Sequence, residues 1–217
     1  YRSYKLMQNP LRKRFRYCFF NANIILILIN IVVFIITQKN PRLKYLLSMN
    51  PYFVVHYKFY WQILTCFFCH SDFSHIFLNM FALLIFGTHL EKSMGSKEYL
   101  LFYFLSGITS TLLALATYIF TNSYEVFLLG ASGVVYAILF AFTVIFPKVK
   151  LFIFGIVPVA GPILILIYAI IELLNQLFNF NDGIAHMVHL FGFIVAWLYF
   201  IIRTGINPIK VWKNALR

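Results

Sequence analysis

Long apolar stretches separated by short basic segments constrain this chain more than any other feature. Of its 217 residues, 62% are hydrophobic and 11% are charged, whereas a soluble domain is nearer half apolar and a quarter charged. A helix that crosses a membrane needs about 20 mostly apolar residues. Six stretches meet this need, near 18–37, 73–90, 99–120, 131–147, 151–173 and 184–203. We therefore expect an all-α membrane protein with six transmembrane helices.

The domain organisation is predicted to be simple. The six stretches follow one another without an internal repeat or a low-complexity linker, which indicates one membrane domain over 18–203 between a basic tail at 1–17 and a second tail at 204–217. The segment 38–72 is rich in aromatic residues and is not uniformly apolar. Because Tyr and Trp favour the headgroup region, we expect this segment to lie partly in the outer membrane surface rather than to cross the bilayer.

The formal net charge of +12 raises the question of nucleic acid binding. The basic residues lie between the apolar stretches and form no single motif, so we expect no nucleic acid partner and expect contact with the lipid bilayer instead. Fourteen of them fall on one side of the predicted topology: Arg2, Lys5, Arg12, Lys13, Arg14, Arg16, Lys92, Lys97, Lys148, Lys150, Arg203, Lys210, Lys213 and Arg217. The other side has four: Lys39, Arg42, Lys44 and Lys58. This imbalance places both termini in the cytoplasm, and six spans with short loops favour a bacterial plasma membrane.

Four polar side chains share one predicted depth. In this orientation the second, fourth and sixth stretches all run from the outside to the inside. His75 and Asn79 lie in the first turns of the second stretch, Ser132 begins the fourth, and His189 lies about five residues into the sixth. All four are therefore expected in the outer third of the membrane, where polar groups are costly and typically functional.

A serine and a histidine at one depth indicate nucleophilic catalysis. A serine hydroxyl becomes a useful nucleophile only when a base removes its proton, and histidine suits that task near neutral pH. We predict that Ser132 is the nucleophile and His189 the base. Gly133 with Ala137 on the fourth stretch, and Gly192 in the sixth, provide the small residues that let membrane helices approach closely.

Acyl transfer also needs hydrogen-bond donors for the oxyanion. His75 and Asn79 are four residues apart and share a helix face, and the backbone N–H of Ser132 lies near a helix N-terminus, where amides are free. These three donors form the predicted oxyanion pocket. Tyr136 lies one turn below Ser132 and is expected to pack against the ring of His189.

No acidic residue is expected to orient the histidine. The acids near the apolar stretches look like loop or helix-end residues: Asp72, Glu91, Glu125, Glu172 and Asp182. The prediction is therefore a Ser132–His189 dyad rather than a triad, with no cofactor and no metal ion.

Three short motifs resemble those of one known family. The run Gly130-Ala131-Ser132-Gly133 is similar to a Gly-x-Ser-Gly motif, the run from His75 to Asn79 to a His-x-x-x-Asn motif, and the run from His189 to Gly192 to the histidine motif of a sixth span. Together they resemble the rhomboid intramembrane serine proteases, over roughly residues 18–203. The resemblance implies cleavage of single-span transmembrane proteins near the outer membrane face, with access beside the fifth span, and supporting roles for Gly130, Gly133, Tyr136 and Gly192.

The chain departs from the family pattern at two places. Gln62 follows Trp61 where many members have arginine, which bears on how the surface segment is anchored. Ala196 stands where a second glycine is common, which bears on how closely the helices pack. His186 competes with His189 for the role of the base, because it lies three residues earlier on the same helix, and His70 is expected at the membrane interface.

Two rival functions come from other classes. The first is an inactive rhomboid-like protein that binds membrane helices without cutting them. The second is a haem-bearing electron carrier, because Cys66-Phe67-Phe68-Cys69-His70 fits the pattern for covalent haem attachment. A zinc site made by Cys66, Cys69, His70 and His75 is a further alternative, although the His-Glu-x-x-His motif of zinc proteases is missing from the sequence.

Overall fold

The computed structural model describes residues 10–13, 15–153, 156–178 and 185–217. The first elements are η1 (Pro10–Arg12), α1 (Ala22–Lys39), α2 (Pro41–Leu47), α3 (Pro51–Tyr57), α4 (Gln62–Thr65) and η2 (Cys66–Phe68). They are followed by α5 (Phe73–Ala82), the π-helical turn η3 (Leu83–Gly87), α6 (Thr88–Met94), α7 (Ser96–Phe120) and α8 (Ser132–Ile145). The last elements are β1 (Lys150–Ile153), β2 (Val157–Ala160), α9 (Gly161–Leu177), α10 (His186–Tyr199), the π-helical turn η4 (Phe200–Thr204) and α11 (Pro208–Ala215).

Four helices are long and apolar enough to cross a membrane: Ala22–Lys39, Phe73–Met94, Ser96–Phe120 and His186–Thr204. Two further apolar helices are shorter, since α8 has 14 residues and α9 has 17. At about 1.5 Å per residue they are roughly 21 and 26 Å long, less than the ~30 Å hydrocarbon core. Of the six predicted spans, four thus correspond to helices of full spanning length and two to shorter apolar helices, so the count of six spans stays a prediction. The protein is an integral membrane protein.

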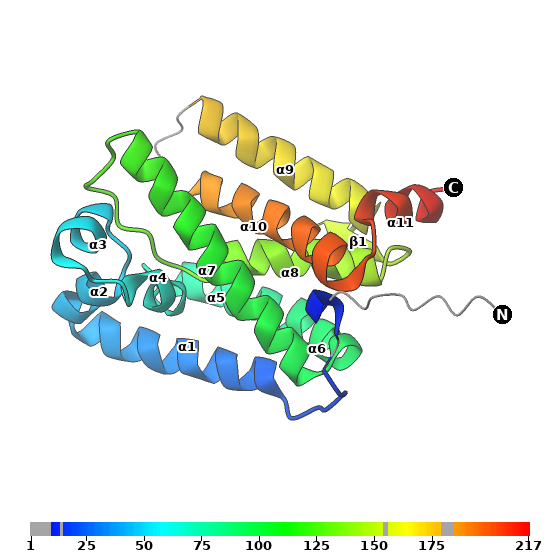
Figure 1. The fold of residues 1–217 in the computed structure, drawn as a ribbon, viewed down its shortest axis with the longest axis horizontal. Coiled ribbons are helices and arrows are strands. Elements are labelled where there is room, and N and C mark those ends of the chain that lie inside the picture. The colour runs from blue at the N-terminus through cyan, green and yellow to red at the C-terminus, as the bar shows by residue number, and fades with distance from the viewer. Residues whose placement is uncertain (1–9, 14, 154–155, 179–184) are drawn as a thin grey trace.

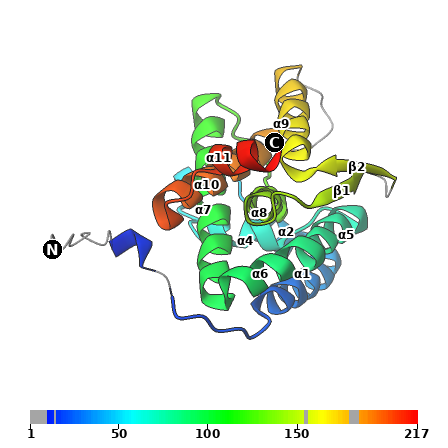
Figure 2. The same ribbon diagram turned by 90° about the vertical axis from the view of Figure 1, so that its right-hand side faces the viewer.

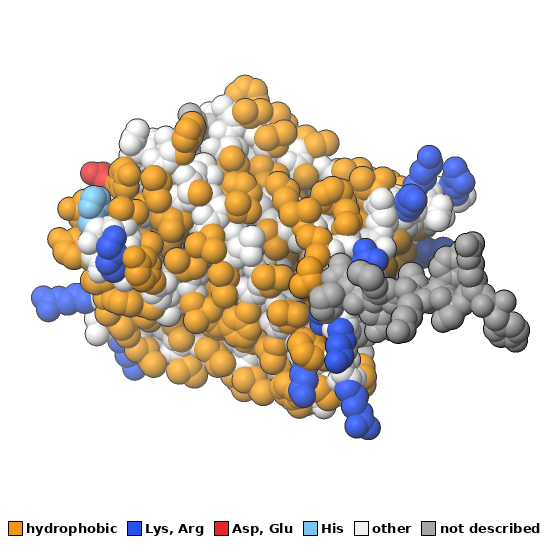
Figure 3. All heavy atoms as spheres, in the orientation of Figure 1, with side chains coloured by type: hydrophobic (Ala, Val, Ile, Leu, Met, Phe, Trp, Pro, Cys, Tyr) orange, Lys and Arg blue, Asp and Glu red, His pale blue; other side chains and the backbone are white. Residues whose placement is uncertain are grey.

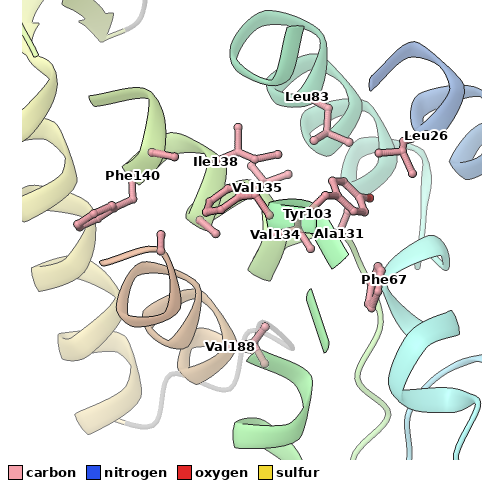
Figure 4. Packing of buried hydrophobic residues seen from close by; sticks show 14 of the residues in the cluster. Leu26, Phe67, Leu83, Tyr103, Ala131, Val134, Val135, Ile138, Phe140 and Val188 are labelled. Carbon is pink, nitrogen blue, oxygen red and sulfur yellow. The ribbon is translucent and has the colours of Figure 1, made fainter. Parts of the chain in front are cut away.

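The helix α8 lies at the centre of the bundle. Seen nearly end-on, it is surrounded by α5, α6, α7, α9 and α10 (Figure 2), and α10 runs beside it between α7 and α9 (Figure 1). Its buried residues Val134, Val135 and Ile138 point into the core shared with Leu83 and Tyr103 (Figure 4). The face in Figure 3 has an apolar middle, with the visible Lys and Arg side chains at the two ends of the long axis. This distribution is typical of a bilayer-embedded bundle.

The predicted fifth span begins too early, and the fold is not purely helical. Residues predicted to start this span instead form an antiparallel hairpin, in which β1 pairs with β2 from Lys150 opposite Ala160 to Ile153 opposite Val157. The helix begins only at Gly161, because Pro162 in its first turn fixes a helical φ and needs no donor there. Short runs of β-branched residues fit a strand and a buried helix equally well, which explains the error.

The segment 38–72 does not cross the bundle. It contains the short helices α2, α3, α4 and η2, none longer than seven residues, and it packs at one end of the molecule (Figure 1). Gln62, where the resemblance suggested arginine, is fully buried. Its side chain accepts from Asn50 N at 3.1 Å and donates to the Leu46 carbonyl at 3.0 Å, so it anchors this segment from within.

Helices α8 and α10 touch backbone to backbone. A Cβ added at Gly192 would lie 3.3 Å from the backbone nitrogen of Ala137 and still closer to the carbonyl oxygen of Gly133. A Cβ added at Gly133 would lie 2.6 Å from Val188. These glycines therefore set the distance between the two helices, and Ala196 in place of a glycine is accommodated with no exposed surface.

Replacing Gly192 by alanine should destabilise the protein by about 1–3 kcal/mol, because the new methyl group meets a carbonyl oxygen that cannot move independently of its helix. Denaturant unfolding in detergent micelles measures the effect. As a control, Leu198→Phe adds volume on the same helix at a residue that is 40% exposed. There the free energy of unfolding should change by no more than about 0.5 kcal/mol. Equal stability of Gly192→Ala and wild type would contradict this account of the helix contact.

Candidate active site

The loop before Ser132 is held by the surface segment. Met49 and Leu128 form a two-way backbone bridge, with N···O distances of 2.9 and 2.8 Å. Gly130 N donates to the Cys66 carbonyl at 3.0 Å, and Ala131 N reaches His70 Nε2 at 3.5 Å. Four backbone groups of this loop are thus fixed from outside, and they deliver Ser132 to the first position of α8.

The hydroxyl of Ser132 contacts the imidazole of His189. Ser132 Oγ lies 2.7 Å from His189 Nε2. His189 stands in the first turn of α10 and is 6% exposed, whereas Ser132 is half-buried. The two residues are 57 positions apart in sequence and come from two helices that touch at Gly133 and Gly192. A nucleophile and a base within hydrogen-bond reach are what serine catalysis requires.

The supporting residues surround this pair. The ring of Tyr136 stacks on that of His189, with centroids 4.1 Å apart and planes 8° from parallel. Gly130 has φ +115°, and a Cβ there would lie 2.5 Å from His75 Nε2. Only glycine allows both this backbone conformation and so close an approach of the imidazole.

His75 and Asn79 face the same space. Asn79 is buried, and its amide nitrogen donates to the His75 carbonyl at 2.8 Å, which leaves its second N–H available. His75 Nδ1 lies 3.0 Å from Ser71 Oγ, and that hydroxyl donates to Asp72 Oδ2 at 2.5 Å. Hydrogen bonds from Ser71 and from the His75 backbone N–H keep the pKa of the exposed Asp72 carboxyl below its usual value.

A cavity of about 750 Å³ opens onto these groups. It is bounded by α5, the loop before α8, and helices α8, α9 and α10. Its lining includes five predicted site residues and mixes them with apolar side chains: His75, Asn79, Ser132, Tyr136, His189, Leu78, Phe127, Leu139 and Tyr168. Such a cavity is large enough for part of a peptide chain and for water.

The structure places an acid beside the histidine, where the sequence analysis expected none. Glu172 lies inside α9, is 5% exposed, and places Oε1 3.0 Å from His189 Nδ1, although the ring N–H is not aligned as in a hydrogen bond. The same oxygen accepts from the Tyr136 hydroxyl. Glu172 looked like a helix-end residue only because the fifth span was predicted ten residues too early. Asp182, another acid considered, lies outside the described residues.

His186 shares this carboxylate. Its Nδ1 lies 2.6 Å from Glu172 Oε2, and its ring centroid is 6.4 Å from that of His189. Within the described part of the chain, Glu172, His186 and His189 are the one group whose ligand atoms are close enough to hold a metal ion, all within 4.8 Å. The ring nitrogen that lies 2.7 Å from Ser132 Oγ belongs to His189.

The zinc alternative made by Cys66, Cys69, His70 and His75 has no geometric support among the described residues. These side chains do not form a ligand group, and both cysteines are free and buried. Burial raises the pKa of each thiol to about 12 and lowers the pKa of His70 to about 3. Cys66 instead contacts Thr111, and His70 packs edge-on against His75, so the run serves as packing beneath the loop before Ser132.

The comparisons with known proteins show which family the chain belongs to. A family model described as the rhomboid domain matches residues 58–205, about two thirds of the chain. The chain belongs to the rhomboid family. The matched range begins within the surface segment and includes both helices of the Ser132–His189 pair.

Three rhomboid relatives illustrate the range of the family. The Bacillus subtilis (strain 168) protein named "Putative rhomboid protease YdcA" is 27% identical over 135 residues, covering 61% of this chain and 62% of that protein. "Rhomboid protein 1, mitochondrial" of Saccharomyces cerevisiae is 33% identical over 99 residues, 43% of this chain and 27% of its own length. "Inactive RHOMBOID-like protein 8" of Arabidopsis thaliana is 39% identical over 54 residues, 25% and 15% of the two chains. The chain spans less than two thirds of each relative, and their names include both a protease and an inactive protein.

Sequence reasoning missed Glu172 as a member of the site, although a signal was present. An ionisable residue inside an apolar span is a functional candidate by default, and Glu172 would have met that rule had the helix been started at Pro162. The anchoring role of His70 had no local signal, because its partner lies in the loop before Ser132. For Gln62, the departure from the family pattern pointed to the anchoring of the surface segment but not to Asn50 as the partner.

Proposed function

We propose that this rhomboid-family protein is an intramembrane serine endopeptidase. The observation that carries the proposal is the 2.7 Å contact between Ser132 Oγ and His189 Nε2, beside a cavity that His75 and Asn79 also line. Family membership supplies the reaction class in which such a pair is used. The proposed substrates are single-span transmembrane proteins, which enter from the lipid bilayer.

The reaction follows from the geometry. Ser132 Oγ bonds to the scissile carbonyl carbon while its proton passes to His189 Nε2, and a tetrahedral oxyanion forms. The C–N bond then breaks, and His189 returns the proton to the leaving amine, which leaves an ester on Ser132. Water from the cavity attacks that ester with His189 as base. The Oγ–C bond breaks, and the hydroxyl of Ser132 regains its proton.

The oxyanion would be held by the Ser132 backbone N–H, the second amide hydrogen of Asn79, and His75. The first amides of a helix have no partner one turn back, so that of Ser132 is available. Because the Ser71 hydroxyl donates its one proton to Asp72, it accepts from His75 Nδ1, and His75 then donates from Nε2 when its ring carries both protons. The Ser71–Asp72 pair therefore favours a His75 ring that is protonated on Nδ1.

The substrate helix must unwind locally before it is cut. A closed helix hides its carbonyls behind its own hydrogen bonds, and in lipid those bonds have no replacement. The cavity offers polar groups at one end of α5, α8 and α10, where an unwound segment and water can be accommodated together. In the proposed orientation this end faces outward, and both termini are cytoplasmic.

An inactive helix-binding protein is the alternative function, and one relative carries such a name. The Ser132–His189 contact favours the protease, because a binder needs no hydroxyl paired with a buried imidazole. Polar groups inside a membrane bundle cost free energy, so they are typically found where they have a function.

Ser132→Ala and His189→Ala should each abolish cleavage of a transmembrane reporter, because each removes one half of the proton transfer. A fluorophosphonate probe should label the wild type and not Ser132→Ala. Ser106→Ala is a matched control, since Ser106 is a fully buried serine on α7 with no hydrogen-bond partner for its hydroxyl. Lack of labelling and cleavage by wild type in lipid vesicles would favour the binder. Activity in His189→Ala with loss in His186→Ala would transfer the base role to His186.

Asn79→Ala should reduce kcat by about 10²–10³-fold or less, the cost of one oxyanion donor. Thermal unfolding checks that the variant remains folded, because Asn79 also bonds the His75 carbonyl. The conservative substitution Asn79→Gln keeps the amide, so the protein should still fold, but the added methylene should misplace the donor. A kcat for Asn79→Ala equal to that of wild type would remove this residue from the oxyanion pocket.

The orientation can be tested by thiol labelling in a Cys18→Ser background. Cys66 and Cys69 should not be labelled in such an assay, because both thiols are buried and their burial raises the pKa of each to about 12. A membrane-impermeant maleimide should label Lys58→Cys in sealed cells and Lys210→Cys only after permeabilisation. The reverse pattern would invert the proposed topology.

A further inference from the structure

We infer that Glu172 is a positioning residue that orients His189, so that the site works as a Ser132–His189–Glu172 triad built from three different helices. This inference rests on the proposed protease function and extends it to α9. It replaces the dyad expected from the sequence. Glu172 itself does not contact the reacting atoms, and it acts only through the imidazole.

The contacts form a continuous chain from the carboxylate to the nucleophile. Glu172 Oε1 lies 3.0 Å from His189 Nδ1, and the opposite ring nitrogen, Nε2, lies 2.7 Å from Ser132 Oγ. When Nε2 takes the serine proton, the ring becomes a cation whose Nδ1 lies 3.0 Å from the carboxylate, within reach of a hydrogen bond after a small rotation of the ring. An acid at this place both selects the tautomer with a free Nε2 and stabilises the cation.

The carboxylate is itself held in place. Oε1 accepts from the Tyr136 hydroxyl, and Oε2 lies 2.6 Å from His186 Nδ1. Tyr136 also stacks on the ring of His189, so one side chain fixes both the acid and the plane of the base. With three partners on two neighbouring helices, Glu172 has little freedom to turn away, which is what a positioning group needs.

The depth of the group strengthens its effect. Glu172 lies five residues before the end of α9, and His189 lies three residues after the start of α10, so the two residues lie at a similar distance from the ends of their helices. Both are less than 7% exposed. In a dry environment the attraction between a carboxylate and a developing imidazolium is much larger than in water.

A structural metal ion is a weaker explanation of the same cluster. Two ligands bound to one zinc ion at ~2.0–2.1 Å in tetrahedral geometry are about 3.3 Å apart. The N···O distances between Glu172 and the two histidines are 2.6 and 3.0 Å. The carboxylate and the imidazoles are therefore in direct contact, and an ion would have to separate them.

The test compares Glu172→Gln, Glu172→Asp and wild type in lipid vesicles, measuring kcat and KM for a transmembrane reporter and the rate of fluorophosphonate labelling. The amide keeps an acceptor for Tyr136 but removes the charge, and its NH2 group can donate a hydrogen bond to His189 Nδ1, which favours the tautomer that carries its proton on Nε2. We expect Glu172→Gln to lower kcat and the labelling rate together by roughly 10²–10⁴-fold, with KM changed less than about threefold. Glu172→Asp should recover at least about tenfold of this loss.

Glu98→Gln is the matched control. Glu98, on α7, is also a buried carboxylate, and its partners lie on the long helix that carries His189. They are Arg203 at 2.7 Å and the Tyr199 hydroxyl at 2.5 Å, and they do not line the cavity. This variant should lose thermal stability while kcat stays within about threefold of wild type. His186→Gln should cost less than about tenfold in kcat, because His186 supports the acid rather than the base.

The outcomes separate the inference from the proposed function. If the wild type is active and the kcat of Glu172→Gln stays within about threefold of the wild-type value, the triad is overturned while the proposed protease function stands. The triad also fails if Glu98→Gln loses as much kcat as Glu172→Gln at an equal loss of stability, or if His186→Gln reproduces the whole effect. Inactivity of wild type toward both the reporter and the probe would instead refute the proposed function.

Discussion

The close approach of α8 and α10 is the contact on which the rest of the site depends. Gly133 and Gly192 bring two helix backbones together at a distance that a single methyl group would disturb. In the first turns of the same two helices, this approach places Ser132 Oγ 2.7 Å from His189 Nε2. Because lipid provides no hydrophobic force between helices, such small-residue packing is the main way to hold two membrane helices in a fixed register.

Three glutamates buried in the bundle each bind groups on another part of the chain. Glu91 accepts from the backbone N–H groups of Ala22 and Asn23, at 2.6 and 3.0 Å, and so caps the start of α1. Glu98 binds Arg203, and Glu172 binds His186 and contacts His189. Each pair joins different helices, so charges that would be costly in hydrocarbon are used as interhelical ties. The Glu172 cluster borders the cavity through Tyr136 and His189.

Much of the fold and part of the site could be read from the sequence. Hydropathy located the helices, because a spanning helix has a length and composition that few other structures share. The polar residues Ser132 and His189 stood out against an apolar background, and the structure brings them together. The fifth span failed because residues 150–160 carry an apolar, β-branched pattern that suits a hairpin as well as a helix. That error moved Glu172 to a helix end, and the acid beside the base was lost with it. The anchor His70 depends on Ala131, 61 positions away in the chain, for which local sequence carries no signal.

The π-helical turn Leu83–Gly87 gives the second long helix one residue more than a regular α-helix would hold. Asn79 lies on one side of this turn and Glu91 on the other, and each must face inward, one toward the cavity and one toward α1. Since each residue turns an α-helix by about 100°, removing the surplus residue would swing these two faces apart by roughly that angle. Deleting one residue here would therefore give a more regular helix in which Asn79 and Glu91 can no longer both face inward. The number of residues in this turn is thus constrained even where their side chains are free to vary.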